Sequence, residues 1–221
     1  MTNGRLLLAG GGNAQQSEPL DKLLASWVGE NGRLLYIPIA MRRTGTSFPD
    51  CWAWITAVFE PLGCGNITMW TDLTAHQPEE LDEFTAVYIG GGNTYSLLAE
   101  LRASGFDVGL RDYVAQGGIV YGGSAGAIIL GGDIAACAHM DSNNVGLADT
   151  AALNLVQNHD LWVHYQAADD DVRITDYIAE RRVPILAIAE EAGVWVENGR
   201  FQPVGDAPVY RFDEMGRKVL L

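Results

Sequence analysis

"IVYGGSAGAIILGG", residues 119–132, runs from a strand pattern through a turn of small residues into an apolar helix pattern. Short apolar runs that end in glycine and lead into helices are typical of a parallel sheet with crossover helices. At the bend, residues 122–126 fit G-x-S-x-G, in which a sharp turn presents a serine to solvent. Ser124 is therefore a candidate nucleophile, although a glycine turn with a passive serine has the same five letters. The backbone N–H of Ala125, which opens the following helix, is a candidate oxyanion donor.

The same succession of strand and helix patterns recurs along the chain. We expect strands at 5–10, 33–40, 66–70, 85–90, 118–122, 161–165 and 184–189. We expect helices near 19–29, 48–60, 78–83, 94–103, 108–116, 125–131 and 170–181. The segments AGVWVENGRFQPVG and PVYRFDEMGRKVLL instead predict antiparallel hairpins, the first turning at Asn198-Gly199. Because no linker divides the sequence, it predicts one α/β domain over 1–221, with three layers around a mostly parallel sheet and with C-terminal β-hairpins.

Charge and composition exclude several classes of partner. The 221 residues carry 28 acidic and 14 basic side chains, and the formal net charge of −14 leaves no basic surface for a nucleic acid. No run of 18 apolar residues occurs, so we expect no membrane span. The three cysteines lack CxxC spacing and the chain starts without a leader pattern, which indicates reduced thiols in the cytoplasm and no metal site.

The string GGGN occurs twice, at 10–13 and at 90–93, and follows an expected strand each time. Ligands of parallel sheets bind beyond the carboxyl ends of the strands, so both strings and the Ser124 turn are expected at one edge of the sheet. A nucleotide cofactor is not expected there. The first string lacks GxGxxG spacing, no acidic residue ends the second strand, and GxxxxGK[ST] is absent.

A nucleophilic serine requires a base and an orienting acid. His164 ends an expected strand at the same edge, whereas His159 precedes that strand, so His164 is the better candidate base. Glu190 follows the strand PILAIA and is the candidate acid, with the adjacent Glu191 in reserve. A histidine that only satisfies core hydrogen bonds is the alternative for His164.

The sequence also resembles peptidase E, or aspartyl dipeptidase, and its relative cyanophycinase. The matching pieces occur in the family's order: IPIA, IGGGNTYSLL (89–98), GGSAGA (122–127), ALNL (152–155), VHY (163–165) and AIAEEAGVWV (187–196). The resemblance implies a serine hydrolase on a flavodoxin-like sheet, similar to class I glutamine amidotransferases, that needs no cofactor. It places nucleophile, base and acid on Ser124, His164 and Glu190. The oxyanion donors implied are the amides of Gly92 and Ala125.

Two departures from the family argue against Asp-X dipeptidase specificity. The segment HYQAADDDVRI is short and has no arginine before Arg173, and the chain stops soon after its last hairpin. Arg42 and Arg43 are candidate carboxylate anchors by another route, or solvated loop residues. Gly91 and Asn93, in the second GGGN, are further candidates for substrate contact.

The expected function is hydrolysis of a short peptide or small amide through an acyl-enzyme, by a monomer or homodimer. The alternative belongs to a different class of function. It is a weakly catalytic or non-catalytic module that binds a small metabolite on the same fold.

Overall fold

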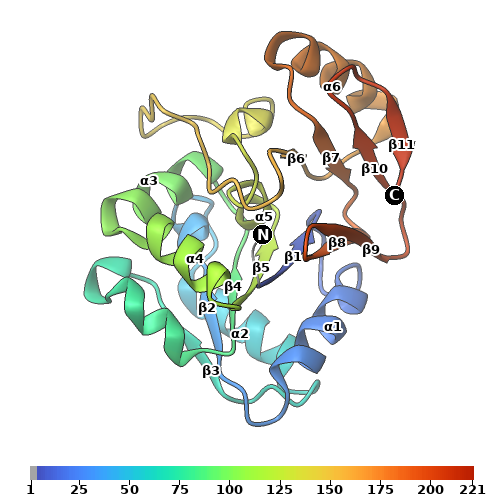
Figure 1. Ribbon diagram of the computed structural model, residues 1–221. Helices are drawn as coiled ribbons and strands as arrows, with labels where there is room; N and C mark the ends of the chain where they lie inside the picture. Colours follow the sequence, from blue (N-terminus) through green and yellow to red (C-terminus); the bar gives the residue numbers. More distant parts are fainter. Residues whose placement is uncertain (1–3) are drawn as a thin grey trace.

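The larger of two sheets forms the centre of the computed structural model, which describes residues 4–221 except for the side chain of Arg43 (Figure 1). In spatial order it consists of β3 (Ile67–Met69), β2 (Leu34–Ile37), β4 (Ala86–Ile89), β5 (Ile119–Gly123), β1 (Arg5–Ala9), β8 (Ala192–Glu197) and β9 (Arg200–Gly205). The strands from β3 to β1 pair in parallel, and β8 and β9 are antiparallel additions. The predicted α/β fold with a mostly parallel sheet is confirmed.

Helices cover both faces of this sheet, which gives the expected three layers. Side chains of each strand alternate between the faces, so that Leu7 and Leu6 of β1 belong to different core clusters. Because both faces are covered, the central strands are almost wholly apolar and buried. The helices on one face are α1 (Glu18–Val28) and α2 (Phe48–Phe59); those on the other are α3 (Thr94–Ser104), α4 (Phe106–Ala115) and the short α5 (Ala125–Ile128).

Some expected helices differ in type or length. The segment 78–83 forms a 3-10 helix, η3 (Pro78–Glu83), and α5 ends three residues before its expected end at 131. The remaining 3-10 segments are η1 (Ile39–Arg43), η2 (Leu73–Ala75) and η4 (Ile134–Cys137).

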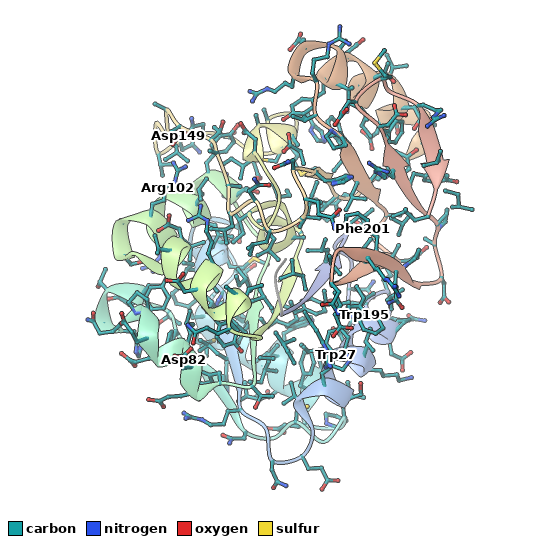
Figure 2. The ribbon with its side chains drawn as sticks, viewed as in Figure 1. Trp27, Asp82, Arg102, Asp149, Trp195 and Phe201 are labelled. Atoms are coloured by element: carbon teal, nitrogen blue, oxygen red, sulfur yellow. The ribbon has the colours of Figure 1, made fainter. Side chains whose placement is uncertain are left out.

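The expected strands around 161–165 and 184–189 do not join the central sheet. They become β6 (Asp160–Trp162) and β7 (Ile185–Ile188), which form a second sheet with β10 (Val209–Phe212) and β11 (Lys218–Leu220) in the order β11-β10-β7-β6. This sheet and α6 (Ala167–Arg181) form the upper part of the molecule in Figure 1. The place beside β1 is instead taken by β8, whose side chain Trp195 packs against Trp27 of α1 at 5.4 Å between ring centroids (Figure 2).

Both expected C-terminal hairpins are present. β8 and β9 pair around Asn198 and Gly199, which have φ values of 51° and 74°. Positive φ at both central residues is the type I′ geometry that matches the twist of a two-residue hairpin. β10 and β11 form the second hairpin.

Cys51, Cys64 and Cys137 are buried free thiols. Within residues 4–221, no helix has both the length and the apolar character needed to cross a bilayer.

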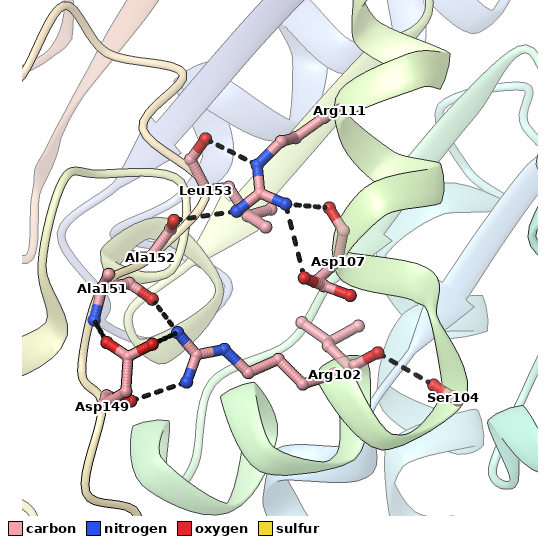
Figure 3. Close-up of polar contacts among 9 residues, drawn as sticks. Arg102, Ser104, Asp107, Arg111, Asp149, Ala151, Ala152 and Leu153 are labelled. Carbon is pink, nitrogen blue, oxygen red and sulfur yellow. Dashed lines mark hydrogen bonds and ion pairs between the residues drawn. The ribbon is translucent and has the colours of Figure 1, made fainter.

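An irregular segment, residues 138–159, connects η4 to β6 and is held by arginines of α3 and α4 (Figure 3). Arg102 donates hydrogen bonds to the carbonyls of Asp149 and Ala151, both at 2.6 Å, and pairs with the Asp149 carboxylate at 3.1 Å. Arg111 donates to the carbonyls of Ala152 and Leu153 at 3.1 Å. The guanidinium groups thus supply donors to four carbonyls that receive no backbone hydrogen bond within the described residues.

Asp21 of α1 is a buried acid, 1% exposed, on the face covered by α1 and α2. The Ser17 hydroxyl donates a hydrogen bond to its Oδ2 at 2.7 Å. Burial raises the pKa of Asp21 from 3.8 to about 6. The folded protein therefore holds this proton more tightly than the unfolded chain does, and the stability that it contributes is lost as pH rises from about 4 to about 6.

Replacing Arg102 by methionine is expected to lower the free energy of unfolding by about 1–3 kcal/mol, because two carbonyls lose charged donors. Denaturant titration measures this loss, and hydrogen exchange should speed up first in residues 138–159. The matched control is Arg200→Met, at an exposed position of β9. Equal stability of both variants would contradict the role assigned to Arg102.

Asp21→Asn is expected to gain about 2 kcal/mol of stability relative to the wild type between about pH 4 and pH 7, because the variant has no proton to lose. Unfolding titrations at several pH values give this difference. Asp82→Asn, at an exposed acid of η3 (Figure 2), is the control and should show a difference that does not depend on pH in the same way. A pH-independent difference for Asp21→Asn would contradict the assignment.

Candidate active site

The segments that follow β1, β2, β4 and β5 meet at one edge of the central sheet, because these strands are parallel and adjacent. A cavity of about 930 Å³ lies between them. Both GGGN turns and the serine turn line it, through Gly11, Gly12, Gly91, Gly92, Asn93 and Ser124. The two GGGN turns and the serine turn therefore lie together at this edge, as expected from the sequence.

Ser124 occupies a strained turn between β5 and α5. Its backbone has φ 50° and ψ −110°, a conformation that costs a non-glycine residue on the order of 1–3 kcal/mol. Its N–H donates to the carbonyl of Ala9 in β1 at 3.1 Å. The turn needs a glycine at position 126, because a Cβ on Gly126 would come within 2.1 Å of the Ile89 carbonyl oxygen. The chain can pass this close to β4 only without a side chain.

His164 lies between Ser124 and Glu190 in one chain of hydrogen bonds. Its Nε2 is 2.8 Å from Ser124 Oγ, and its Nδ1 is 2.9 Å from Glu190 Oε1. A carboxylate accepts only, so Nδ1 donates its proton to Glu190 and Nε2 is left to accept from the serine hydroxyl. This is the tautomer that a general base requires.

The backbone brings His164 to this place by an unusual route. The residue follows β6 of the second sheet, has φ 53°, and donates its N–H to the carbonyl of Gly10 at 3.0 Å. Gly11 makes room for the ring, because a Cβ there would lie 2.1 Å from His164 Cε1.

The two adjacent glutamates have different partners. Glu190, half-exposed, faces His164, whereas Glu191 Oε1 accepts from Gln16 Nε2 at 3.3 Å. The same Gln16 nitrogen is 3.4 Å from Glu190 Oε2 and so bridges both carboxylates. Gln16, three residues after the end of the first GGGN, was not among the candidates from the sequence.

His159 is buried, and its ring nitrogens are hydrogen-bonded to neighbouring residues away from Ser124. It is 3% exposed, its Nδ1 donates to the carbonyl of Val156 at 2.9 Å, and its Nε2 accepts from Arg211 at 2.9 Å. Burial lowers the pKa of His159, which favours the neutral ring, and both of its ring nitrogens already have hydrogen-bond partners.

The amides of Gly92 and Ala125 donate no hydrogen bond to any part of the chain that the structure describes. Both are therefore available to a ligand oxygen. Gly91 also lies close to the serine, since a Cβ on it would be 3.2 Å from Ser124 Cβ. Because α5 spans only Ala125–Ile128, the free N–H of Ala125 matters more here than a helix dipole.

The arginine candidates do not add a cation to the described lining. Arg42 donates to the carbonyl of Thr71 at 2.6 Å and pairs with Glu100 at 3.2 Å. The side chain of Arg43, at the end of η1, lies outside the described part of the structure. Asn93 lines the cavity but caps α3, accepting from Ser96 N at 2.9 Å and donating to the carbonyl of Ser142 at 3.0 Å.

Four aromatic side chains line the cavity: Tyr36, Trp54, Tyr88 and Tyr121. The sequence favours helix packing for Trp54, with a pocket wall as the alternative, and does not single out the three tyrosines. Within the described residues, no group of three or more His, Cys, Asp or Glu side chains is arranged to hold a metal ion.

Gly11→Ala is expected to displace the His164 ring and to slow labelling of Ser124 by a fluorophosphonate by about 10²-fold. Mass spectrometry of the labelled protein over time measures the rate. Gly45→Ala is the matched control, because Gly45 also has positive φ, 91°, but a Cβ there meets nothing within 4 Å. Equal labelling rates for the two variants would show that Gly11 does not hold the ring in place.

Comparison with known proteins matches residues 6–204 to the family model of Peptidase family S51. An uncharacterized peptidase of Listeria monocytogenes is 43% identical over 72 residues, 32% of this chain and 35% of that protein. Peptidase E of Shewanella putrefaciens is 27% identical over 140 residues, 61% of this chain and 59% of that protein. The chain thus spans less than two thirds of the length of these curated relatives.

Among solved structures, a peptidase from an acI-B1 Actinobacterium has the same fold, with a TM-score of 0.73 and 22% identity over 99% of this chain and 93% of that one. The family match extends from β1 into β9 and includes every strand of the central sheet. On this evidence the chain belongs to Peptidase family S51.

Proposed function

We propose that this protein is a serine peptidase that hydrolyses short peptides through an acyl-enzyme. The observation that carries the proposal is the continuous hydrogen-bond chain from Ser124 Oγ through the His164 ring to Glu190. Family membership and a relative named Peptidase E support the same chemistry.

In the first half-reaction, Ser124 Oγ attacks the peptide carbonyl carbon while His164 Nε2 takes the hydroxyl proton. Glu190 holds the imidazole in position and stabilises the imidazolium that forms. The carbonyl oxygen becomes an oxyanion and accepts hydrogen bonds from the free amides of Ala125 and Gly92. His164 then returns the proton to the leaving amine, the C–N bond breaks, and the acyl group remains on Ser124.

In the second half-reaction, water takes the place of the amine. His164 removes a proton from the water as it attacks the acyl carbon, and then gives the proton to Ser124 Oγ as the ester bond breaks. The products are a free carboxylate and the regenerated serine. No step requires a group other than the side chains and amides named here.

Short substrates suit the site because the cavity, at about 930 Å³, is of the size that binds small molecules. Asp-X specificity is not part of the proposal, because the described lining offers no arginine to hold an aspartyl side chain. A cytoplasmic location and a monomeric or dimeric state stay predictions from the sequence.

Ser124→Ala is expected to lower kcat for every cleaved dipeptide by about 10³-fold or more, because attack requires Oγ. Amine release from a dipeptide library measures the rates, and labelling by a fluorophosphonate should disappear in the same variant. Ser26→Ala, at an exposed serine of α1, is the control and should keep both activities.

Two results would contradict the proposal. The first is hydrolysis retained by Ser124→Ala on all substrates of the wild type. The second is the absence of labelling and of hydrolysis in the wild type together with tight binding of a small metabolite, which would favour the binding-module alternative.

A further inference from the structure

Part of the wall of the cavity is aromatic, and we call the space against it the aromatic chamber; its residues are Tyr36 of β2, Trp54 of α2, Tyr88 of β4 and Tyr121 of β5. Tyr36 and Tyr88 meet edge to face at 5.4 Å and 80°, and Trp54 and Tyr88 at 5.8 Å and 67°. Tyr121 stacks on Tyr88 at 4.2 Å. Rings set at these angles present both faces and edges to the space between them.

This aromatic chamber reaches the backbone just before the proposed nucleophile and at the start of the second GGGN turn. Tyr88 Oη lies 3.3 Å from the position that a Cβ would take on Gly123, the residue before Ser124. Tyr36 Oη lies 3.3 Å from the same position on Gly90. The chamber therefore adjoins the residue that precedes the proposed nucleophile.

The polar groups of the chamber are the hydroxyls of its three tyrosines. Tyr121 Oη is buried without a hydrogen bond of ordinary geometry among the described residues, and it lies beside the buried Asp21 carboxyl. Tyr36 and Tyr88 are 3% and 5% exposed, and burial raises the pKa of each above its ordinary value. At neutral pH these groups stay protonated, so they offer hydrogen bonds to a ligand and no charge.

The acidic residues at the mouth of the cavity are already engaged. Asp50 Oδ2 accepts from the Ser47 hydroxyl at 2.6 Å in the cap of α2, and Asp141 Oδ2 accepts from the Thr94 amide at 2.8 Å. A charged side chain of either sign would lose its water in the chamber, and an acidic one would also meet these carboxylates. An uncharged aromatic side chain fits the chamber best.

We propose that the aromatic chamber is the specificity subsite of this enzyme and that it accepts an aromatic side chain, Phe or Tyr, on the substrate residue next to the scissile bond. The inference rests on the proposed peptidase function, because the scissile bond is defined by Ser124.

The test uses the full-length protein and dipeptides of the forms X-Ala and Ala-X, with X as Phe, Tyr, Ala, Lys or Asp. At one of the two positions, kcat/KM for Phe is expected to exceed that for Ala by about tenfold or more, with Lys and Asp below Ala. Trp54→Ala should reduce the ratio of Phe to Ala by about tenfold. The matched control is Trp52→Ala, two residues earlier on α2 and 40% exposed, which should leave the ratio unchanged.

Binding separates this inference from the proposed function. Titration of Ser124→Ala with the same dipeptides, followed by tryptophan fluorescence or calorimetry, measures side-chain selectivity without hydrolysis. Selective binding of the Phe peptide with no turnover by the wild type would overturn the peptidase proposal alone. Turnover with Asp or Lys preferred, or with Phe and Ala equal within about twofold, would overturn the subsite alone. Trp54→Leu, which keeps an apolar packing group, tests the same wall if the alanine variant does not fold.

Discussion

The carboxyl end of β1 is the joint on which the candidate site depends. The carbonyl of Ala9 accepts the amide of Ser124, and the next carbonyl, that of Gly10, accepts the amide of His164. The Gly10 amide in turn donates to Ala192 at the start of β8, directly after the two glutamates. Two successive residues thus fix the segments that carry the candidate nucleophile, base and acid.

This joint explains why the second sheet does not separate the histidine from the serine. A Cβ on Gly10 would lie 2.0 Å from the Ala189 carbonyl oxygen, so the chain leaving β7 runs against the end of β1. His164 comes from β6, the neighbour of β7, and reaches β1 through its own amide. Backbone hydrogen bonds between the sheets do the positioning that one continuous sheet would otherwise provide.

Sequence patterns predicted the central strands well, because a strand buried on both faces must be apolar along its whole length. The runs LLLA, LLYI and AVYI satisfy that condition and lie in the sheet. The same patterns could not tell which sheet a strand joins. β7 is as apolar as β4, yet β4 joins the central sheet and β7 joins the second one. The position beside β1 in the central sheet is occupied by β8.

The candidate site was predicted in part for a similar reason. Ser124, His164 and Glu190 carry chemistry that their residue types reveal, and their segments end at a common edge. The expectation placed His164 at the end of a strand of the main sheet, whereas it lies in a turn with φ 53° after β6. Arg42, another candidate, is held by Glu100 and the Thr71 carbonyl, a pairing between distant segments that no local pattern contains.

The three tyrosines of the aromatic chamber were beyond prediction because a tyrosine on a strand has the same letter in a packed core and in a cavity wall. What distinguishes the two is the space opposite the ring. Here that space exists because Gly90 and Gly123 place no side chain beside the hydroxyls of Tyr36 and Tyr88. Gly123 also directly precedes Ser124, so the segment that holds the candidate nucleophile borders the aromatic chamber as well.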